Sequence, residues 1–168
     1  MILLFLLETR SNNRSDWIYV KSTLDYFYEN RKCRYDALFC KSKDELIKQD
    51  KLIKRKITEY TKYTNNEYKV LLVADYDRKE EKNKNIADYC NKNKYELIWM
   101  NPNIEKVYLN KDIKSGDKKR EAEKFAKNKN SIFPHLNNLE YTEPLKEKCG
   151  SNIIIVVDKY LIRKNKKQ

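Results

Sequence analysis

Residues 68–77 read YKVLLVADYD, an apolar run that ends in two aspartates. An uninterrupted apolar run of this kind, without proline or glycine, is typical of a strand that is buried on both faces. A second run, ILLFLL at residues 2–7, has the same character and ends at Glu8. Because helices on both sides cover such strands, the two runs favour a parallel α/β sheet.

Segments with helical periodicity separate further strand-like runs. After a polar loop, Trp17, Val20 and Leu24 recur at helical spacing. The hydroxyl of Ser15 is expected to cap that helix. The remaining pattern predicts strands at 35–40 and 95–100 and helices at 44–63, 79–93 and 104–109. This alternation over residues 1–110 predicts an α/β domain whose mostly parallel sheet has about four strands, with helices on both faces.

Residues 111–168 are predicted to form a basic, mainly helical C-terminal extension that packs on the same domain. Residues 110–130 carry eight Lys or Arg and four Asp or Glu, a composition typical of an exposed helix. Residues 135–148 show no regular pattern. The run IIIVV at 153–157 would suit a strand because its residues are β-branched. Its spacing also fits a helix capped by Ser151, which is the prediction we favour.

The composition limits the classes to which this chain can belong. Its 168 residues fit one domain, and 37 Lys or Arg against 25 Asp or Glu give a net charge of +12. That charge attracts polyanions, although 29 Lys against 8 Arg is also typical of AT-rich coding. No apolar run approaches the roughly 20 residues of a membrane span, so we expect a cytoplasmic protein without membrane contact. With 2 Gly and no CxxC pair, the chain lacks a P-loop, a dinucleotide-binding turn and a zinc site of usual spacing.

Acidic residues follow the predicted buried strands. Glu8 follows the first strand, and Asp75 and Asp77 follow the strand at 68–74. Ligands of parallel sheets bind at the carboxyl ends of the strands, where these three side chains are expected to converge. Carboxylate oxygens suit Mg²⁺ or Mn²⁺, so the sequence predicts a catalytic metal site there. Strand-end acids are also common solubilising residues, which is the plainer interpretation.

A third segment, Asn101-Pro102-Asn103-Ile104-Glu105, follows the strand at 95–100. The proline ends that strand, and Glu105 falls in the first turn of the next helix, where a carboxylate is favourable. By itself this segment indicates no more than a strand end and a helix start.

In this order, the three segments resemble the Toprim-type nucleases, and most closely their RloB-like branch, over roughly residues 2–109. Three positions depart from the family pattern: Thr9 stands where glycine is usual, and Ile104 and Val107 replace aromatic residues. The matching positions are Glu8 for the first glutamate, Ser15-Asp16-Trp17-Ile18-Tyr19 for the Ser/Thr-acid-x-x-Tyr helix start, Asp75-Tyr76-Asp77 for the metal pair, and Asn101, Pro102 and Glu105 for the third segment.

The resemblance implies a Mg²⁺- or Mn²⁺-dependent nucleic-acid phosphodiesterase, of a type found in prokaryotic defence systems and mobile elements. Asp75 and Asp77 would hold the metal, and Glu8 would bind it or act as a general acid or base. Glu105 would support that metal or hold a second one. The residues expected to contact the phosphate backbone are Arg78, Lys111, Lys114, Lys118, Lys119 and Arg120.

Other functions stay open at this point. The missing glycine and the altered aromatic positions also fit an inactive nucleic-acid- or protein-binding module on the same scaffold. A phosphatase of the haloacid-dehalogenase type is less favoured, because its DxD follows the first strand, where this chain has Glu8. The sequence does not decide between DNA and RNA, nor between a partner protein and a second copy of the chain.

Overall fold

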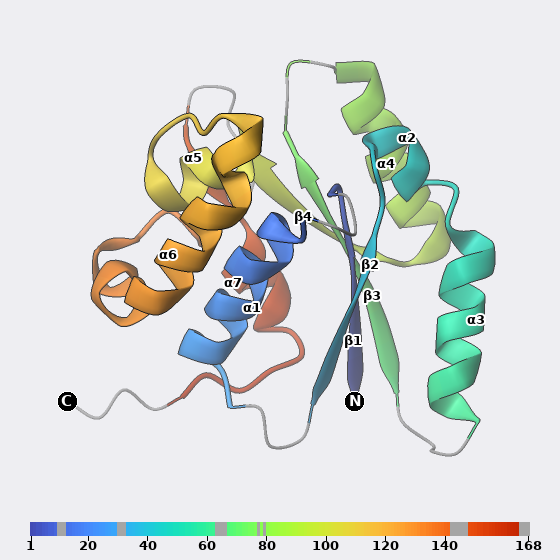
Figure 1. The fold of residues 1–168 in the computed structure, drawn as a ribbon. Coiled ribbons are helices and arrows are strands. Elements are labelled where there is room, and N and C mark those ends of the chain that lie inside the picture. The colour runs from blue at the N-terminus through green and yellow to red at the C-terminus, as the bar shows by residue number, and fades with distance from the viewer. Residues whose placement is uncertain are drawn as a thin grey trace.

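The computed structural model describes residues 1–9, 13–29, 33–62, 67–76, 78, 80–141 and 148–164. These residues form an α/β domain in which helices cover both faces of one central sheet (Figure 1). Asp77, one of the predicted metal ligands, lies outside the described residues. Among the described helices, none has the length and apolar character needed to cross a bilayer.

The sheet has five strands in the order β2-β1-β3-β4-β5, one more than predicted. The first four are parallel to one another, and β5 runs antiparallel to β4. The predicted strands are therefore confirmed, and the fifth comes from the C-terminal region. Their bounds are β1 Ile2–Leu7, β2 Arg34–Phe39, β3 Tyr68–Asp75, β4 Glu96–Asn101 and β5 Gly150–Ser151.

The short strand β5 depends on contacts that are distant in sequence. Ser151 donates its backbone N–H to the carbonyl of Asn138 at 2.8 Å and pairs with Met100 of β4. A Cβ at Gly150 would lie 2.1 Å from the ring of Tyr141 and 2.7 Å from the Asn138 carbonyl oxygen. Gly150 is therefore required by close packing, and no periodicity in the sequence could have predicted a two-residue strand.

The helices form two layers, one on each face of the sheet (Figure 1). Two short 3₁₀ turns, at Ser115–Asp117 and Phe133–His135, flank α6. The first layer contains α1 Ser15–Phe27, α5 Ile104–Leu109, α6 Lys118–Ile132 and α7 Ile153–Val157. The second contains α2 Lys43–Leu46, α3 Asp50–Thr61 and α4 Glu80–Asn93.

Alternate residues of each central strand enter separate cores. Leu3, Phe5 and Leu7 of β1 belong to the core beneath the first layer, whereas Leu4 and Leu6 belong to the other core. Every residue of β1 is buried. This two-sided burial explains why the strand is apolar throughout, and burial of each large side chain contributes about 1.5–3 kcal/mol to folding.

Two details of the helices differ from prediction. The helix expected over 44–63 is divided into α2 and α3. The side-chain amide of Gln49 donates to the carbonyl of Glu45 at 3.0 Å, and the N–H of Lys48 donates to the same oxygen at 3.1 Å. These bonds replace the regular helical bond at that carbonyl and break the helix. Ser15 is the first residue of α1 rather than its cap, since Arg14 occupies the N-cap position with a φ of 51°.

The C-terminal extension packs on the α/β core through aromatic rings. Phe125 of α6 lies 5.1 Å from Tyr19 of α1 and 5.3 Å from Tyr108 of α5, measured between ring centroids. The predicted helix at 153–157 is confirmed as α7, and the hydroxyl of Ser151 accepts the N–H of Ile153 at 3.1 Å.

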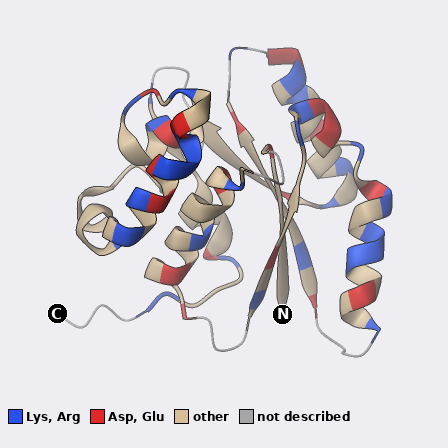
Figure 2. Cartoon of the chain, viewed as in Figure 1, with Lys and Arg blue, Asp and Glu red and all other residues tan. Residues whose placement is uncertain are grey.

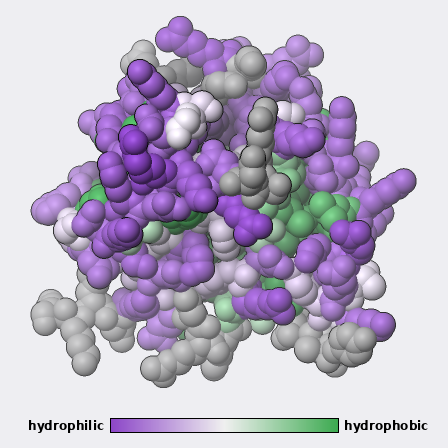
Figure 3. Space-filling model, in the orientation of Figure 1, coloured by the Kyte–Doolittle hydropathy of each residue, from purple (hydrophilic) through white to green (hydrophobic). Residues whose placement is uncertain are grey.

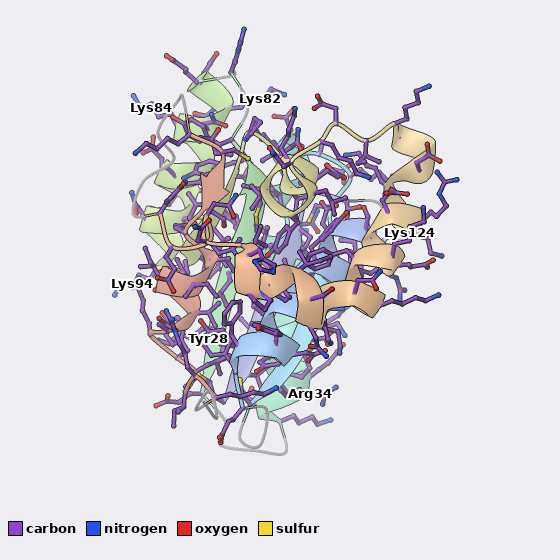
Figure 4. The ribbon with its side chains drawn as sticks, turned by 90° about the vertical axis from the view of Figure 1, so that its left-hand side faces the viewer. Tyr28, Arg34, Lys82, Lys84, Lys94 and Lys124 are labelled. Atoms are coloured by element: carbon purple, nitrogen blue, oxygen red, sulfur yellow. The ribbon has the colours of Figure 1, made fainter. Side chains whose placement is uncertain are left out.

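The final described residues pair with the end of α1. Tyr28 and Arg163 form an isolated antiparallel bridge. The hydroxyl of Tyr28 donates to Asp158 at 2.8 Å, and the guanidinium of Arg163 binds the same carboxylate. Figure 4 shows Tyr28 between the end of α1 and α7. These contacts hold the C-terminal segment against the first helix of the fold.

Lys, Arg, Asp and Glu positions are distributed over the helices of both layers (Figure 2). The face of the molecule seen in Figure 3 is mostly hydrophilic, with one apolar patch between β2 and the helices α2 and α3. Among the described residues, Tyr68 and Ile162 are the exposed large hydrophobic side chains. Most contacts that a partner could make with this face are therefore with polar or charged side chains.

Candidate functional site

A polar cavity of about 400 Å³ lies at the carboxyl ends of β1 and β3. The register pairs Leu7 of β1 with Val73 of β3, so Glu8 and Asp75 leave the sheet at the same edge. The N-terminus of α1 and the start of α6 close the cavity from the side. Its lining consists of Glu8, Thr9, Asn13, Ser15, Asp16, Lys41, Asp75, Ser115 and Lys118.

Asp75 lies at the end of β3 and contacts the next helix. One of its carboxylate oxygens accepts the N–H of Ile104 at 3.1 Å, at the first residue of α5. Burial raises the pKa of Asp75 well above its usual range, and the negative charges of Asp16, Glu8 and Glu105 raise it further. The carboxyl groups of Asp16, Glu8 and Glu105 are therefore close enough to disfavour the ionisation of Asp75.

Asp16 belongs to this cluster although it comes from a helix. It occupies the first turn of α1 and accepts a hydrogen bond from the Ser15 hydroxyl at 2.9 Å. Burial raises the pKa of Asp16 to about 7, and the charge of Glu105 adds to the rise. A carboxyl group with such a pKa exchanges its proton near neutral pH, as an acid-base group in catalysis must.

Glu105 is almost fully buried, with 2% of its surface exposed. It lies in the first turn of α5 and pairs with Lys118, whose Nζ is 3.0 Å from Oε1 of Glu105. Hydrogen bonding to Glu105, followed by the charges of Glu105, Asp75 and Asp16, raises the pKa of Lys118 despite its partial burial. The ammonium group thus offsets part of the negative charge that four carboxyl groups bring together.

The structure brings three of the four predicted acidic residues to one site, namely Glu8, Asp75 and Glu105. Asp16 was not predicted as a site residue, although its position in the helix-start motif directly after the first strand was a usable signal. Within the described part of the chain, no group of three or more His, Cys, Asp or Glu side chains has the geometry to hold a metal ion.

The predicted phosphate-binding residues differ in their surroundings. Lys118 faces the carboxyl cluster, and Lys114 and Arg78 are exposed. The other three pair with carboxylates near them: Lys111 with Glu121 at 2.9 Å, Lys119 with Glu123 at 4.0 Å, and Arg120 with Asp117 at 3.0 Å.

Lys41 is a site residue that the sequence analysis missed. It follows β2, lines the cavity and is exposed to solvent. Its backbone N–H donates to Glu45 at 2.9 Å, which fixes the turn between β2 and α2. The signal available was its position at the carboxyl end of a parallel strand beside β1. Together with Lys118 it gives the cavity two ammonium groups.

The sequence matches no known family model, and no curated protein or solved structure shows significant similarity to it.

Proposed function

We propose that this protein is a Mg²⁺- or Mn²⁺-dependent phosphodiesterase of Toprim type that acts on nucleic acid. One observation carries the proposal: Glu8, Asp16, Asp75 and Glu105 act on one another electrostatically at the carboxyl edge of a parallel sheet, beside an open polar cavity. Buried acidic groups with raised pKa values in a cleft are typical of functional sites.

The donor chemistry of the site fits a hard divalent cation. Oxygen ligands from carboxylates suit Mg²⁺ and Mn²⁺. Burial and then repulsion from neighbouring carboxylates raise the pKa of Asp75, and a cation would relieve that repulsion. One oxygen of Asp75 is engaged by Ile104, and one oxygen of Asp16 by Ser15. No described residue donates a hydrogen bond to the second oxygen of either group, so that oxygen of Asp75 is available to a cation and that of Asp16 to a proton.

In this proposal, the residues of the site bind the cation, bind the phosphate oxygens or transfer the proton. Asp75 and Glu8 would hold the cation, which when bound offsets phosphate charge and lowers the pKa of water. Lys41 and Lys118 would bind the phosphate oxygens at the cavity. Asp16, with a pKa of about 7, would move the proton that the reaction requires. Asp77 keeps its predicted role as a ligand.

The test is cleavage of labelled single- and double-stranded DNA and RNA by the purified chain in Mg²⁺, in Mn²⁺ and in EDTA. We expect metal-dependent cleavage of at least one substrate, and a loss of at least about a hundredfold in Asp75→Asn. Asp112→Asn is the matched control, because Asp112 is 80% exposed and pairs with Lys106 outside the cavity. Equal activity in both variants would exclude the proposal.

A binding module without turnover is the second candidate. It is favoured by Lys118, whose charge already offsets part of the carboxyl cluster in the absence of any cation. The two candidates differ in their metal dependence. Calorimetric titration of Mg²⁺ should show saturable binding that Asp75→Asn removes if the enzyme proposal holds, whereas a binding module would retain nucleic acid in EDTA and bind no cation here.

A further inference from the structure

The outer face of α3 carries a row of basic side chains. Lys54 and Arg55 lie three and four residues after Lys51, which are helical spacings, and all three are exposed. Lys62, at the C-cap of the helix, continues the same row seven residues after Arg55. The opposite face of α3 is buried through Ile53 and Tyr60. In Figure 2, α3 carries blue along its middle, with red near each end.

Two acidic residues near this row, Asp44 and Asp50, contact α4 rather than the row. Asp44 pairs with Lys82 of α4 at 2.6 Å, and Asp50 accepts the hydroxyl hydrogen of Tyr89, also on α4. Lys51 and Lys54 form no ion pair with any carboxylate of the described chain. Arg55 is 3.7 Å from Glu59, which borders the row. Asp44 and Asp50 therefore connect the helices of the second layer, while Glu59 pairs within α3 with Arg55 and Lys56. The outer face still carries more basic than acidic side chains.

The contrast with α6 shows that this arrangement is not general to the molecule. On α6 and just before it, Lys111, Lys119, Arg120 and Lys124 all pair with carboxylates of the same region. Lys124 points outward in Figure 4 but lies 2.9 Å from Glu121. A polyanion binding there must compete with existing ion pairs, whereas at Lys51 and Lys54 it need not.

We propose that the exposed face of α3 binds the phosphate backbone of a nucleic-acid duplex. From Lys51 to Lys62 the row extends about 16 Å along the helix axis, which matches about five base-pair steps of a duplex. Ammonium and guanidinium groups bind phosphate without reading sequence. This surface deepens the proposed function by adding a second contact with the substrate, although binding to it requires no catalysis.

A lipid surface is a poorer match for this face. Helices that lie on membranes combine a basic face with exposed apolar side chains that insert between lipids. The exposed large hydrophobic residues of the described chain, Tyr68 and Ile162, both lie outside α3. The apolar residues of α3 itself pack against the sheet, in the core that contains Ile53.

The test compares two triple variants of equal charge by fluorescence anisotropy in EDTA, at several KCl concentrations. The first is Lys51→Gln/Lys54→Gln/Arg55→Gln. The second, a control, is Lys21→Gln/Lys124→Gln/Lys159→Gln, which removes three lysines that pair with carboxylates. Each lowers the net charge from +12 to 12 − 3 = +9. Labelled DNA and RNA duplexes are the probes, and circular dichroism verifies that both variants fold.

We expect wild type and the control to bind a duplex alike and the α3 variant to bind at least tenfold more weakly. The slope of log K against log salt should fall by about 2 to 3 in the α3 variant, close to 0.9 for each lost phosphate contact. Equal weakening of both variants would overturn the proposal, since net charge alone would then explain binding. Tighter binding of wild type to phosphatidylserine vesicles than to duplexes would also overturn it.

The result is separable from the test of the enzyme. Duplex binding is measured in EDTA, where no divalent cation is available for cleavage, and Asp75 lies at the carboxyl edge of β3 and not on α3. If Asp75→Asn loses cleavage while the α3 variant binds duplexes normally, the enzyme proposal stands and the assignment of α3 fails.

Discussion

The Nζ atom of Lys118 lies 3.0 Å from Oε1 of Glu105, and this ion pair connects the start of α6 with the buried start of α5. Glu105 in turn acts on Asp16 and Asp75, whose pKa values are raised. Lys118 therefore places a positive charge beside the carboxyl groups of Glu105, Asp75 and Asp16. Its position makes the C-terminal extension part of the site rather than an appendage to it.

Replacement of Lys118 should destabilise the metal-free protein. In Lys118→Met, Glu105 would keep its burial and lose its partner, and the carboxyl cluster would lose its cation. Because the lysine side chain is 32% exposed, solvent screening limits the expected loss to about 1 kcal/mol, or about 2–4 °C in Tm. Lys119→Met, on the exposed side of the same helix, should change Tm by less. An unchanged Tm in Lys118→Met would show that the pair contributes nothing to folding.

The raised pKa of Asp16 predicts how stability changes with pH. The folded state holds the proton up to a pKa of about 7, whereas the unfolded chain releases it near 3.8. The folded state thus binds more protons in between, and this group's contribution to the unfolding free energy falls as pH rises from about 4 to about 7. Because asparagine does not titrate, Asp16→Asn lacks this pH-dependent fall in the unfolding free energy. The Tm of the variant, relative to wild type in EDTA, should therefore rise across this interval.

A melting series from pH 4 to pH 8 measures this difference, and Asp112→Asn serves as the exposed control. Because the cavity admits solvent, the expected gain at neutral pH is about 1 kcal/mol rather than the full shift. A difference between Asp16→Asn and wild type that does not vary with pH would contradict the assigned pKa. Excess Mg²⁺ should stabilise wild type more than the variant if Asp16 lies beside the cation.

Gly150 should tolerate no side chain. A methyl group there would overlap the ring of Tyr141, and the Asn138 carbonyl oxygen is only 2.7 Å from the added carbon. Gly150→Ala should cost about 1–3 kcal/mol and raise the exchange of the Ser151 amide, because the hydrogen bond from that amide to the Asn138 carbonyl would be disturbed. Gly116→Ala is the matched control, since a Cβ at Gly116 meets no atom within 4 Å. Equal stability of the two variants would show that β5 moves aside without cost.

The central strands were predictable because each is a short apolar run buried on both faces, so its pattern needs no information about partners. The two-residue strand β5 was not, since it exists only where Asn138 and Met100 position Ser151. The division of α2 from α3 depends on one side-chain bond from Gln49, which no periodicity reveals.

The candidate site was predictable to the extent that it follows strand ends. Glu8 and Asp75 converge because parallel strands end at one edge, a rule that the sequence alone can use. Lys118 was predicted to contact phosphate, but its position beside Glu105 does not follow from strand ends. It depends on the packing of α6 on α1, where Phe125 contacts Tyr19 more than a hundred residues away in the chain.

Protonation of Asp158 at low pH should weaken the contacts that hold the C-terminal segment against the end of α1. Its carboxylate accepts hydrogen bonds from Arg163 and from Tyr28, and the bond from Arg163 lowers its pKa. A carboxyl group with a lowered folded pKa stabilises the protein above its unfolded pKa, and this stability is lost as pH falls through the folded value. Asp158→Asn should therefore be less stable than wild type by about 1 kcal/mol at pH 7, after solvent screening, and equal to it in strong acid.

Comparison of Tm at neutral and acidic pH measures the change, with Asp88→Asn on α4 as a control. A deficit that persists unchanged in acid would assign the effect to lost hydrogen-bond geometry rather than to charge.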